Sequence, residues 1–223
     1  MPYRQIIFAN NEIYHIYNKS VNNEEIFRRK DCLKRALALM DFYRFPAKIS
    51  YSHFLRLNYD LRLNLKKQIE FQGPLVNILA FSFMPNHYHM ELQQLEEDGI
   101  SRFISIWQNS FAKFFNKKNE RNGPLFLEMF KAKRVETREE LIHISRYIHL
   151  NPVSSFLIDV KELAFYPFTS FPAYLGTIKY SFVKTNIILS EFRSVEHYKK
   201  FVYDQADYQR TLEKIKNKVY DYR

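Results

Sequence analysis

Two histidines separated by one residue are the side chains of this sequence best suited to chemistry. His87-Tyr88-His89 lies in a stretch that alternates in polarity, as a strand does. Residues two apart on a strand project from the same face, so both imidazoles can offer a nitrogen ligand to one metal ion. The alternative is a pair of partly exposed strand histidines with ordinary hydrogen bonds, and the pair alone leaves both interpretations open.

A tyrosine is the second candidate for a chemical role. Tyr147 is one of 16 tyrosines and shares a helical spacing with Leu141, Ile144 and Ile148, where a tyrosine usually packs in the core. A phenol has an ordinary pKa of about 10, so it acts as a nucleophile only where a metal or a base favours the phenolate. Periodicity by itself favours the core interpretation.

The charge balance predicts a polyanionic partner. The chain of 223 residues has 34 Lys and Arg against 24 Asp and Glu, a formal net charge of +10, and nucleic acid is the partner that this favours most. Aromatic residues make up 17% of the chain, and unpaired bases stack on such rings, although core packing also accounts for them. The single cysteine, Cys32, excludes an internal disulfide and a cysteine-rich metal cluster, so any metal needs His, carboxylate or amide ligands.

Apolar stretches long enough to span a membrane do not occur in the sequence. Residues 1–11 also lack the apolar run of a signal peptide. We therefore expect a soluble, cytoplasmic protein with no membrane partner, either a monomer or a homodimer.

The elements that must position these residues follow from hydrophobic spacing and turn signals. The first half of the pattern predicts a strand at 13–18, a helix at 32–40 capped by Asp31, a further helical stretch at 52–67, and a buried central strand at 75–83 with a hairpin partner at 87–92. The second half predicts a helix at 100–115, a strand at 130–136 and a helix at 137–151. The last helix begins in a Thr-Arg-Glu-Glu capping box and is ended or kinked by Asn-Pro.

This order of elements predicts an α+β fold, namely a ferredoxin-like antiparallel sheet with helices packed on one face. We expect one domain over residues 1–178, with a helical insertion at about 45–73. Residues 179–223 would form a C-terminal helical extension, with one or two charged helices from residue 191 onward.

Two segments of the sequence resemble a known family. Phe83-Met84-Pro85-Asn86-His87-Tyr88-His89 and Tyr147-Ile148-His149-Leu150-Asn151-Pro152-Val153 are similar to motifs of the REP-associated tyrosine transposases, within the single-tyrosine HUH transposases. The flanking segments 14–18 and 168–176 also look like that family. The resemblance covers residues from about 14 to 176, and the two central motifs are its specific part.

The resemblance implies an activity and a site. His87 and His89 would bind a divalent cation, Mg²⁺ or Mn²⁺, and Tyr147 would attack the scissile phosphate of a DNA strand. The product would be a 5′-phosphotyrosine with a free 3′ hydroxyl, which can reverse the attack and transfer the strand. The implied partner is single-stranded DNA or a hairpin formed by a palindromic repeat, and no nucleotide cofactor is implied.

A third metal ligand is less clearly marked. Asn151 lies one helical turn after Tyr147 and could supply its amide oxygen, as a polar residue does at this position in the family, although Asn-Pro could equally be a plain helix stop. Glu91, two residues beyond His89, is a candidate ligand or a partner of a ligand, or else a solvated strand carboxylate. We expect His15 and His143 to be structural, whereas Arg146 and His149 could contact phosphate or lie on a solvated helix face.

Basic residues flank the predicted site and are candidate DNA contacts. They are Lys113, Lys117, Lys118, Arg121, Lys131, Lys133, Arg134 and Arg146.

The sequence therefore favours a metal-dependent single-stranded DNA endonuclease and strand transferase. Two other functions stay open at this point: a catalytically silent protein that binds DNA or RNA hairpins, and a hydrolase in which the histidine pair activates water.

Overall fold

Four strands form one antiparallel sheet in the computed structural model, which describes residues 6–211. The strands are β1 (Ile13–Lys19), β2 (Val76–Met84), β3 (His87–Gln94) and β4 (Lys131–Val135), and their order across the sheet is β2-β3-β1-β4. β2 and β3 form the predicted hairpin. The predicted α+β fold with an antiparallel sheet is confirmed.

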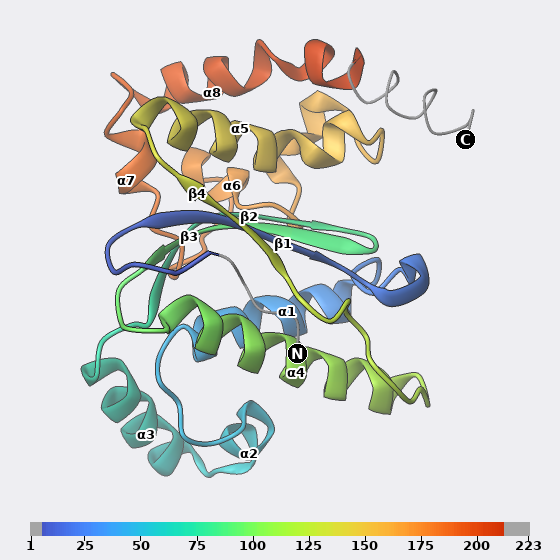
Figure 1. Ribbon diagram of the computed structural model, residues 1–223, viewed down its shortest axis with the longest axis vertical. Helices are drawn as coiled ribbons and strands as arrows, with labels where there is room; N and C mark the ends of the chain where they lie inside the picture. Colours follow the sequence, from blue (N-terminus) through green and yellow to red (C-terminus); the bar gives the residue numbers. More distant parts are fainter. Residues whose placement is uncertain (1–5, 212–223) are drawn as a thin grey trace. The chain divides into compact units, whose positions relative to one another are not determined.

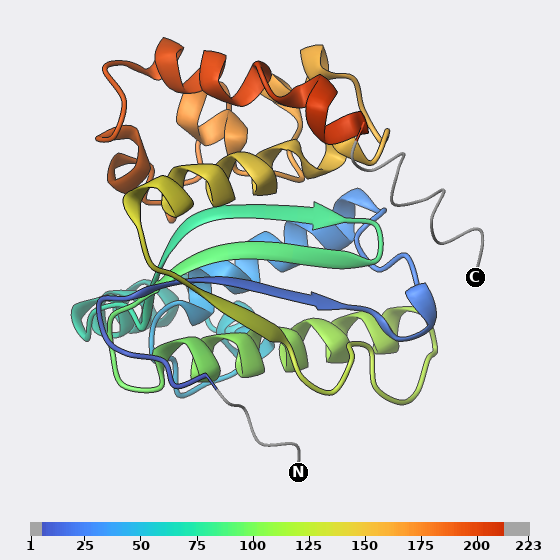
Figure 2. The same ribbon diagram turned by 45° about the horizontal axis from the view of Figure 1, so that its top comes forward.

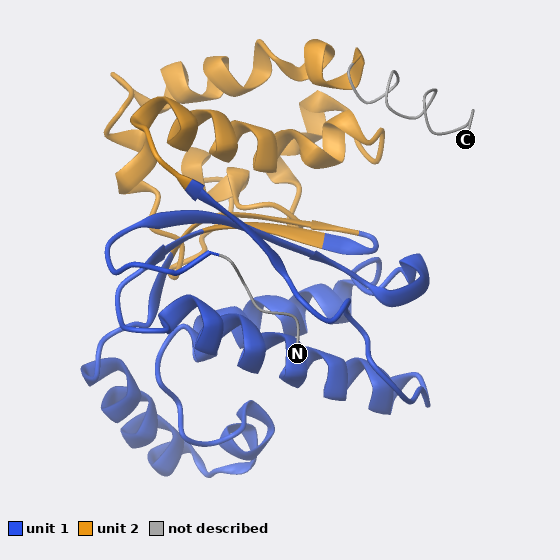
Figure 3. Ribbon diagram, in the orientation of Figure 1, with its two compact units in different colours: residues 1–77, 85–87, 92–134 blue, residues 78–84, 88–91, 135–223 orange. Residues whose placement is uncertain are grey.

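Two compact units divide the chain (Figure 3). Unit 1 contains residues 1–77, 85–87 and 92–134, and unit 2 contains residues 78–84, 88–91 and 135–223. The helices of unit 1 are α1 (Lys30–Tyr43), α2 (Tyr51–Arg56), α3 (Tyr59–Phe71), α4 (Gly99–Lys118) and the 3₁₀ turn η1 (Val21–Asn23). Those of unit 2 are α5 (Arg138–Ser154), η2 (Val160–Phe165), α6 (Phe171–Leu175), α7 (Asn186–Leu189) and α8 (Val195–Tyr203).

The core of unit 1 forms where α1 and α4 lie side by side (Figure 1). Trp107 on α4 is fully buried, and its indole Nε1 donates to the carbonyl of Ala36 on α1 at 3.0 Å. Its ring packs with those of Phe27, Phe111 and Phe126. The indole satisfies its one donor inside an aromatic cluster, which is the usual condition for burying tryptophan.

The start of α1 differs from the prediction. Asp31 does not cap this helix: the N-cap is Arg29, which makes no side-chain capping bond, and Asp31 lies inside the first turn. Its carboxylate instead pairs with Arg29 at 3.1 Å and with Lys118 on α4. The helix thus begins two residues earlier than the apolar spacing indicates, because the polar Lys30 and Asp31 already belong to it.

The helical stretch expected over 52–67 is two helices. Leu57 has an extended backbone (φ −66°, ψ 148°) that ends α2, and the Asn58 side chain accepts from the Leu61 amide at 2.9 Å to begin α3. Ser50 caps α2 in the same way, from the His53 amide at 3.1 Å. An asparagine that satisfies an otherwise unpaired helix amide is a start signal that the leucine spacing conceals.

β2 is an edge strand of the sheet and not the predicted central strand. It is nevertheless buried, because chain segments that come much later in the sequence cover its open edge. The amide of Phe83 donates to the carbonyl of Phe168 at 2.7 Å, Ser170 donates to Phe81 at 3.0 Å, and Lys184 donates to Ile78 at 2.8 Å. An apolar run marks burial on both faces but does not say what pairs with the strand's edge.

In unit 2, α5 begins as predicted and continues further than predicted. The Thr137 hydroxyl accepts from the Glu140 amide at 3.0 Å. Asn151-Pro152 does not end the helix, which continues through Pro152 to Ser154.

α8 packs against α5 (Figure 2), and buries Tyr198 and Val202. Residues 206–211 are also helical, in agreement with a charged helical tail. The remainder of that predicted tail, residues 212–223, lies outside the described residues. Over residues 6–211, the helices include none with the length and apolarity needed to cross a membrane.

Candidate active site

β3 positions the histidine pair. His87 and His89 are two residues apart on this strand and therefore project from one face, while Tyr88 between them points the other way and is fully buried. His89 is itself buried, with 7% of its surface exposed. The strand thus places both imidazoles on one face, as predicted, and buries the ring of Tyr88 behind them.

Asn86 orients the imidazole of His87. The Asn86 Oδ1 atom lies 2.7 Å from His87 Nδ1, and because an amide oxygen can only accept, Nδ1 is the protonated nitrogen and Nε2 carries the lone pair. Burial, with a smaller contribution from the positive charge of Lys19, lowers the pKa of His87 to about 4. A neutral imidazole with an oriented Nε2 lone pair is the form that binds a metal ion.

Tyr147 on α5 contacts His89. Their ring centroids are 5.5 Å apart and the ring planes meet at 87°, an edge-to-face contact. Tyr147 is 37% exposed, unlike Tyr174 and Tyr198, which are buried and whose pKa values burial raises. The tyrosine beside the histidine pair is therefore open to solvent and to a substrate.

Asn151 supplies a third candidate donor one turn along α5. Its Nδ2 donates to the carbonyl of Tyr147 at 3.1 Å, which fixes the amide plane and leaves Oδ1 as the atom suited to a cation. The described residues contain no group of three or more His, Cys, Asp and Glu side chains placed to hold a metal ion. The imidazoles of His87 and His89 and the amide of Asn151 are the candidate donors for a divalent cation, and hydrogen bonds orient the donor atoms of His87 and Asn151.

Glu91 is not a solvated strand carboxylate. The residue is fully buried on β3, and neither carboxylate oxygen has a hydrogen-bond partner within residues 6–211. Burial raises the pKa of Glu91 well above its usual value. The alternating pattern indicates which face Glu91 is on, but it does not reveal that unit 2 covers that face at this position.

His149 holds α5 in the core of unit 2. It is fully buried, its Nε2 lies 2.8 Å from the Ser170 hydroxyl, and its Nδ1 lies 2.8 Å from the hydroxyl of Tyr198. That hydroxyl also lies 3.2 Å from the Ser145 hydroxyl. A buried residue with these partners neither contacts phosphate nor lies on a solvated helix face, so both predictions for His149 are wrong.

A cavity of about 280 Å³ adjoins His87 in unit 1. Tyr17 and Lys19 of β1 and Lys131 of β4 line it, together with Leu127 and Met129. Two lysines, an aromatic ring and two apolar side chains around one cavity can accommodate a phosphate and a base. Among the predicted DNA contacts, Lys131 is the one that lies beside a predicted metal ligand.

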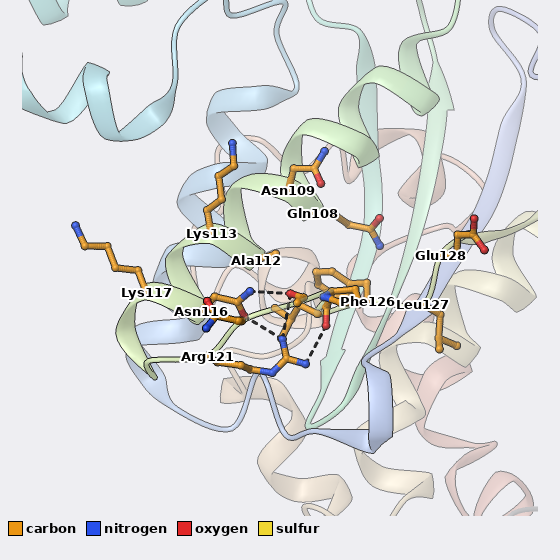
Figure 4. Close-up of a pocket in the computed structure, with 14 residues that line it drawn as sticks. Gln108, Asn109, Ala112, Lys113, Asn116, Lys117, Arg121, Phe126, Leu127 and Glu128 are labelled. Atoms are coloured by element: carbon orange, nitrogen blue, oxygen red, sulfur yellow. Dashed lines mark hydrogen bonds between the residues drawn. The ribbon is translucent and has the colours of Figure 1, made fainter. Parts of the chain in front are cut away.

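Three other predicted DNA contacts lie together in unit 1. Lys113 and Lys117 on α4 and Arg121 after it line a cavity of about 610 Å³ (Figure 4). The guanidinium of Arg121 already has two partners beside the cavity, because its Nη2 donates to the Pro124 carbonyl at 2.8 Å and its Nε pairs with Glu24 at 2.8 Å.

The remaining basic candidates have partners within their own unit. Lys118 pairs with Asp31, and Arg134 pairs with Glu12 at 2.9 Å. Arg146 lies over the ring of Phe201 at 4.2 Å, within the contact between α5 and α8. The charge of Lys133 faces His15, whose pKa falls to about 4, mainly because of burial.

Asn86, Tyr17 and Lys19 are site residues that sequence reasoning missed. Asn86 precedes the histidine pair directly, and a short polar side chain next to a ligand histidine is a signal that it orients the ring. Tyr17 and Lys19 end the first strand, and only the order of the strands brings them to the cavity beside His87.

Comparison with known proteins identifies the fold. The sequence matches no protein-family model and no curated protein. Among solved structures, the chain is similar to a REP-associated tyrosine transposase bound to a REP hairpin, with a TM-score of 0.52 and 15% sequence identity. The match covers 82% of this chain and 98% of that one. At this identity the likeness establishes the fold, and it confirms at that level the resemblance found in the motifs.

Proposed function

We propose that the protein is a metal-dependent DNA endonuclease and strand transferase that acts at hairpin or palindromic repeat DNA. The observation that carries the proposal is the contact of an exposed tyrosine, Tyr147, with His89 of the histidine pair. Either residue alone fits an ordinary strand or helix. Together, on a fold shared with a tyrosine transposase, they fit a tyrosine nucleophile beside a metal site.

His87, His89 and Asn151 would hold the divalent cation, Mg²⁺ or Mn²⁺. The bound cation would supply Lewis-acid polarisation of the scissile phosphate. Asn86 keeps His87 in the tautomer that presents Nε2, and the bond from Asn151 to the Tyr147 carbonyl keeps the amide oriented. Both contacts reduce the reorganisation that binding would otherwise require.

Tyr147 would attack the phosphorus atom with its phenolic oxygen. The new bond joins that oxygen to the phosphorus, the bond from phosphorus to the 3′ oxygen breaks, and the phenol's proton leaves to solvent while the departing oxygen takes one up. The DNA 5′ end is then held as a phosphotyrosine. Because a phosphodiester is exchanged for a phosphodiester, another 3′ hydroxyl can reverse the step without ATP.

DNA is the proposed partner for two reasons. The solved transposase of similar fold is bound to a REP hairpin, and this chain has a formal net charge of +10. The cavity beside His87, with Lys19 and Lys131 in its wall, would receive the nucleotides next to the scissile phosphate.

A covalent adduct tests the proposal. A labelled DNA hairpin with a single-stranded flank, taken from the DNA beside the gene, should become attached to the protein with Mg²⁺ or Mn²⁺ and be retained in a denaturing gel. Tyr147→Phe should abolish the band, whereas Tyr59→Phe, which alters a tyrosine 68% exposed in unit 1, should not.

Other outcomes of the same gel identify the alternatives. Cleaved DNA without an adduct would indicate that the histidine pair activates water instead. Tight binding with neither cleavage nor adduct would indicate a hairpin-binding protein that has lost catalysis. An adduct that persists in Tyr147→Phe would place the nucleophile at another tyrosine.

A further inference from the structure

A recess beside α4 in unit 1 contains none of the proposed catalytic residues. Gln108, Asn109, Lys113 and Lys117 line one side of it from a single stripe of α4, and the segment 121–128 lines the other (Figure 4). Asn109, Lys113 and Lys117 follow one another at intervals of four residues, so their side chains share a face. We call this recess of about 610 Å³ the α4 cavity.

The wall opposite α4 is held rigidly. The side-chain Nδ2 of Asn116 donates to the Gly123 carbonyl at 2.9 Å, and Nη2 of Arg121 donates to the Pro124 carbonyl at 2.8 Å. Further along, the Leu127 amide donates to the Lys19 carbonyl of β1 at 2.9 Å. A cavity whose walls are fixed before binding avoids the entropy that ordering a loop would cost.

Three polar side chains on the α4 side of the cavity suit nucleic acid, while the single carboxylate in the lining, that of Glu128, lies on the opposite wall. Lys113 and Lys117 are exposed at the rim and have no carboxylate partner in the part of the chain that the structure describes. Asn109 is exposed, and its side-chain amide makes no hydrogen bond among residues 6–211. Lysines at this spacing can contact successive phosphates, while an amide can both donate to and accept from a base edge.

We propose that the α4 cavity is a second DNA-binding site, which holds the backbone and an unpaired base of the hairpin substrate outside the proposed metal and tyrosine site. Lys113 and Lys117 contact phosphates, and Asn109, with Gln108 beside it, contacts the base. This inference rests on the proposed function for its choice of DNA as the ligand. It assigns a role to a cavity that the cleavage chemistry does not need.

Binding measured by fluorescence anisotropy tests the inference. The protein carries Tyr147→Phe so that binding stays noncovalent, and the probe is the fluorescein-labelled hairpin with its single-stranded flank. Replacing both Lys113 and Lys117 with alanine should weaken binding. It should also reduce the slope of log Kd against log salt by about 1.5, the loss of two phosphate contacts.

Two further variants distinguish binding in the α4 cavity from a general effect of positive charge. Replacing Lys66 and Lys67 on α3 removes the same two charges from unit 1 but touches no part of the α4 cavity, so the slope should stay nearly unchanged. Asn109→Ala should raise Kd about fivefold with an unaltered slope, because it removes a hydrogen bond and no charge. The inference is overturned if the two double-lysine variants behave alike, or if Asn109→Ala binds like its parent.

Failure of this inference is distinguishable from failure of the proposed function. If the protein with Tyr147 forms no adduct but the anisotropy pattern holds, the α4 cavity binds DNA and the cleavage proposal fails. If the adduct forms but the variants bind alike, the cavity has no such role and the cleavage proposal stands.

Discussion

Tyr147 meets His89 edge to face, with ring centroids 5.5 Å apart, and so places an exposed phenol beside a buried strand histidine. The two residues are 58 positions apart in the sequence, counting from 89 to 147. Helix α5 and strand β3 bring them together inside unit 2.

Asn86 should control metal affinity without being a ligand. Asn86→Ala removes the acceptor for His87 Nδ1–H, so both the tautomer and the ring orientation are lost. The Mn²⁺ concentration for half-maximal adduct formation should rise about 10- to 100-fold. Asn77→Ala, which removes a contact of 2.9 Å with Gln93 on the same hairpin, is the matched control and should leave it unchanged. An unaltered titration for Asn86→Ala would mean that His87 needs no such support.

Asn151 should act through its oxygen. Asn151→Asp keeps an oxygen ligand and should retain adduct formation with Mn²⁺, whereas Asn151→Ala should require at least about 10-fold more metal. Both variants lose the bond from Nδ2 to the Tyr147 carbonyl, so they share any effect on α5. Equal metal titrations of the two variants would show that Asn151 supports the helix and does not bind the metal.

Buried His15 should make the protein less stable in acid. Burial and the charge of Lys133 lower its pKa to about 4 in the folded state, while the unfolded chain binds the proton below about 6.5. As the pH falls from about 6.5 toward 4, the unfolded state gains the proton first, and stability is lost. His15 accounts for about 2 kcal/mol of that loss at pH 5.

Urea unfolding at about pH 7.5 and about pH 5 measures the contribution of His15. The difference between the two free energies of unfolding should be smaller in His15→Phe by about 2 kcal/mol. The remaining difference should persist, because the pKa values of His87 and His149 are also lowered by burial. An unchanged difference would show that water reaches His15 in the folded protein.

The hydroxyl of Tyr198 should stabilise unit 2. Tyr198→Phe leaves the buried His149 Nδ1 and the Ser145 hydroxyl without this partner, at a cost of about 1–3 kcal/mol in the free energy of unfolding. Tyr203→Phe on the same helix keeps the ring contact with Phe171 and should cost much less. Urea denaturation at neutral pH gives the free energy of unfolding of both variants. Equal losses in the two would show that the hydrogen bonds of the Tyr198 hydroxyl do not account for its contribution.

Local signals in the sequence predicted the elements around the site well. Alternation across His87 to Leu92, the Thr137 cap and the apolar spacing of α4 each depend on residues close together in the chain, and each element forms where expected. The histidine pair faces one way for the same reason. The motifs also predicted the fold that the comparison with a solved transposase supports.

Signals that depend on distant residues were the ones missed. The pairing of β2 with segments near residues 168 and 183 makes an edge strand look central, and the helices of unit 2 bury Glu91, which the pattern of β3 leaves open to solvent. Asp31 joins Lys118 instead of capping α1, and that ion pair needs a helix almost 90 residues away. No spacing within β2, β3 or α1 reports such contacts.

The segments around Phe168, Ser170 and Lys184 cover the edge of β2 and so protect the sheet against pairing with other chains. An uncovered edge presents unpaired amides and carbonyls to other chains, and β2 is an apolar strand that carries no charged side chain to discourage such pairing. The backbone bonds from Phe83, Ser170 and Lys184 occupy that edge. A break in the chain between α5 and residue 184 would therefore be expected to endanger solubility before it altered any residue of the proposed active site.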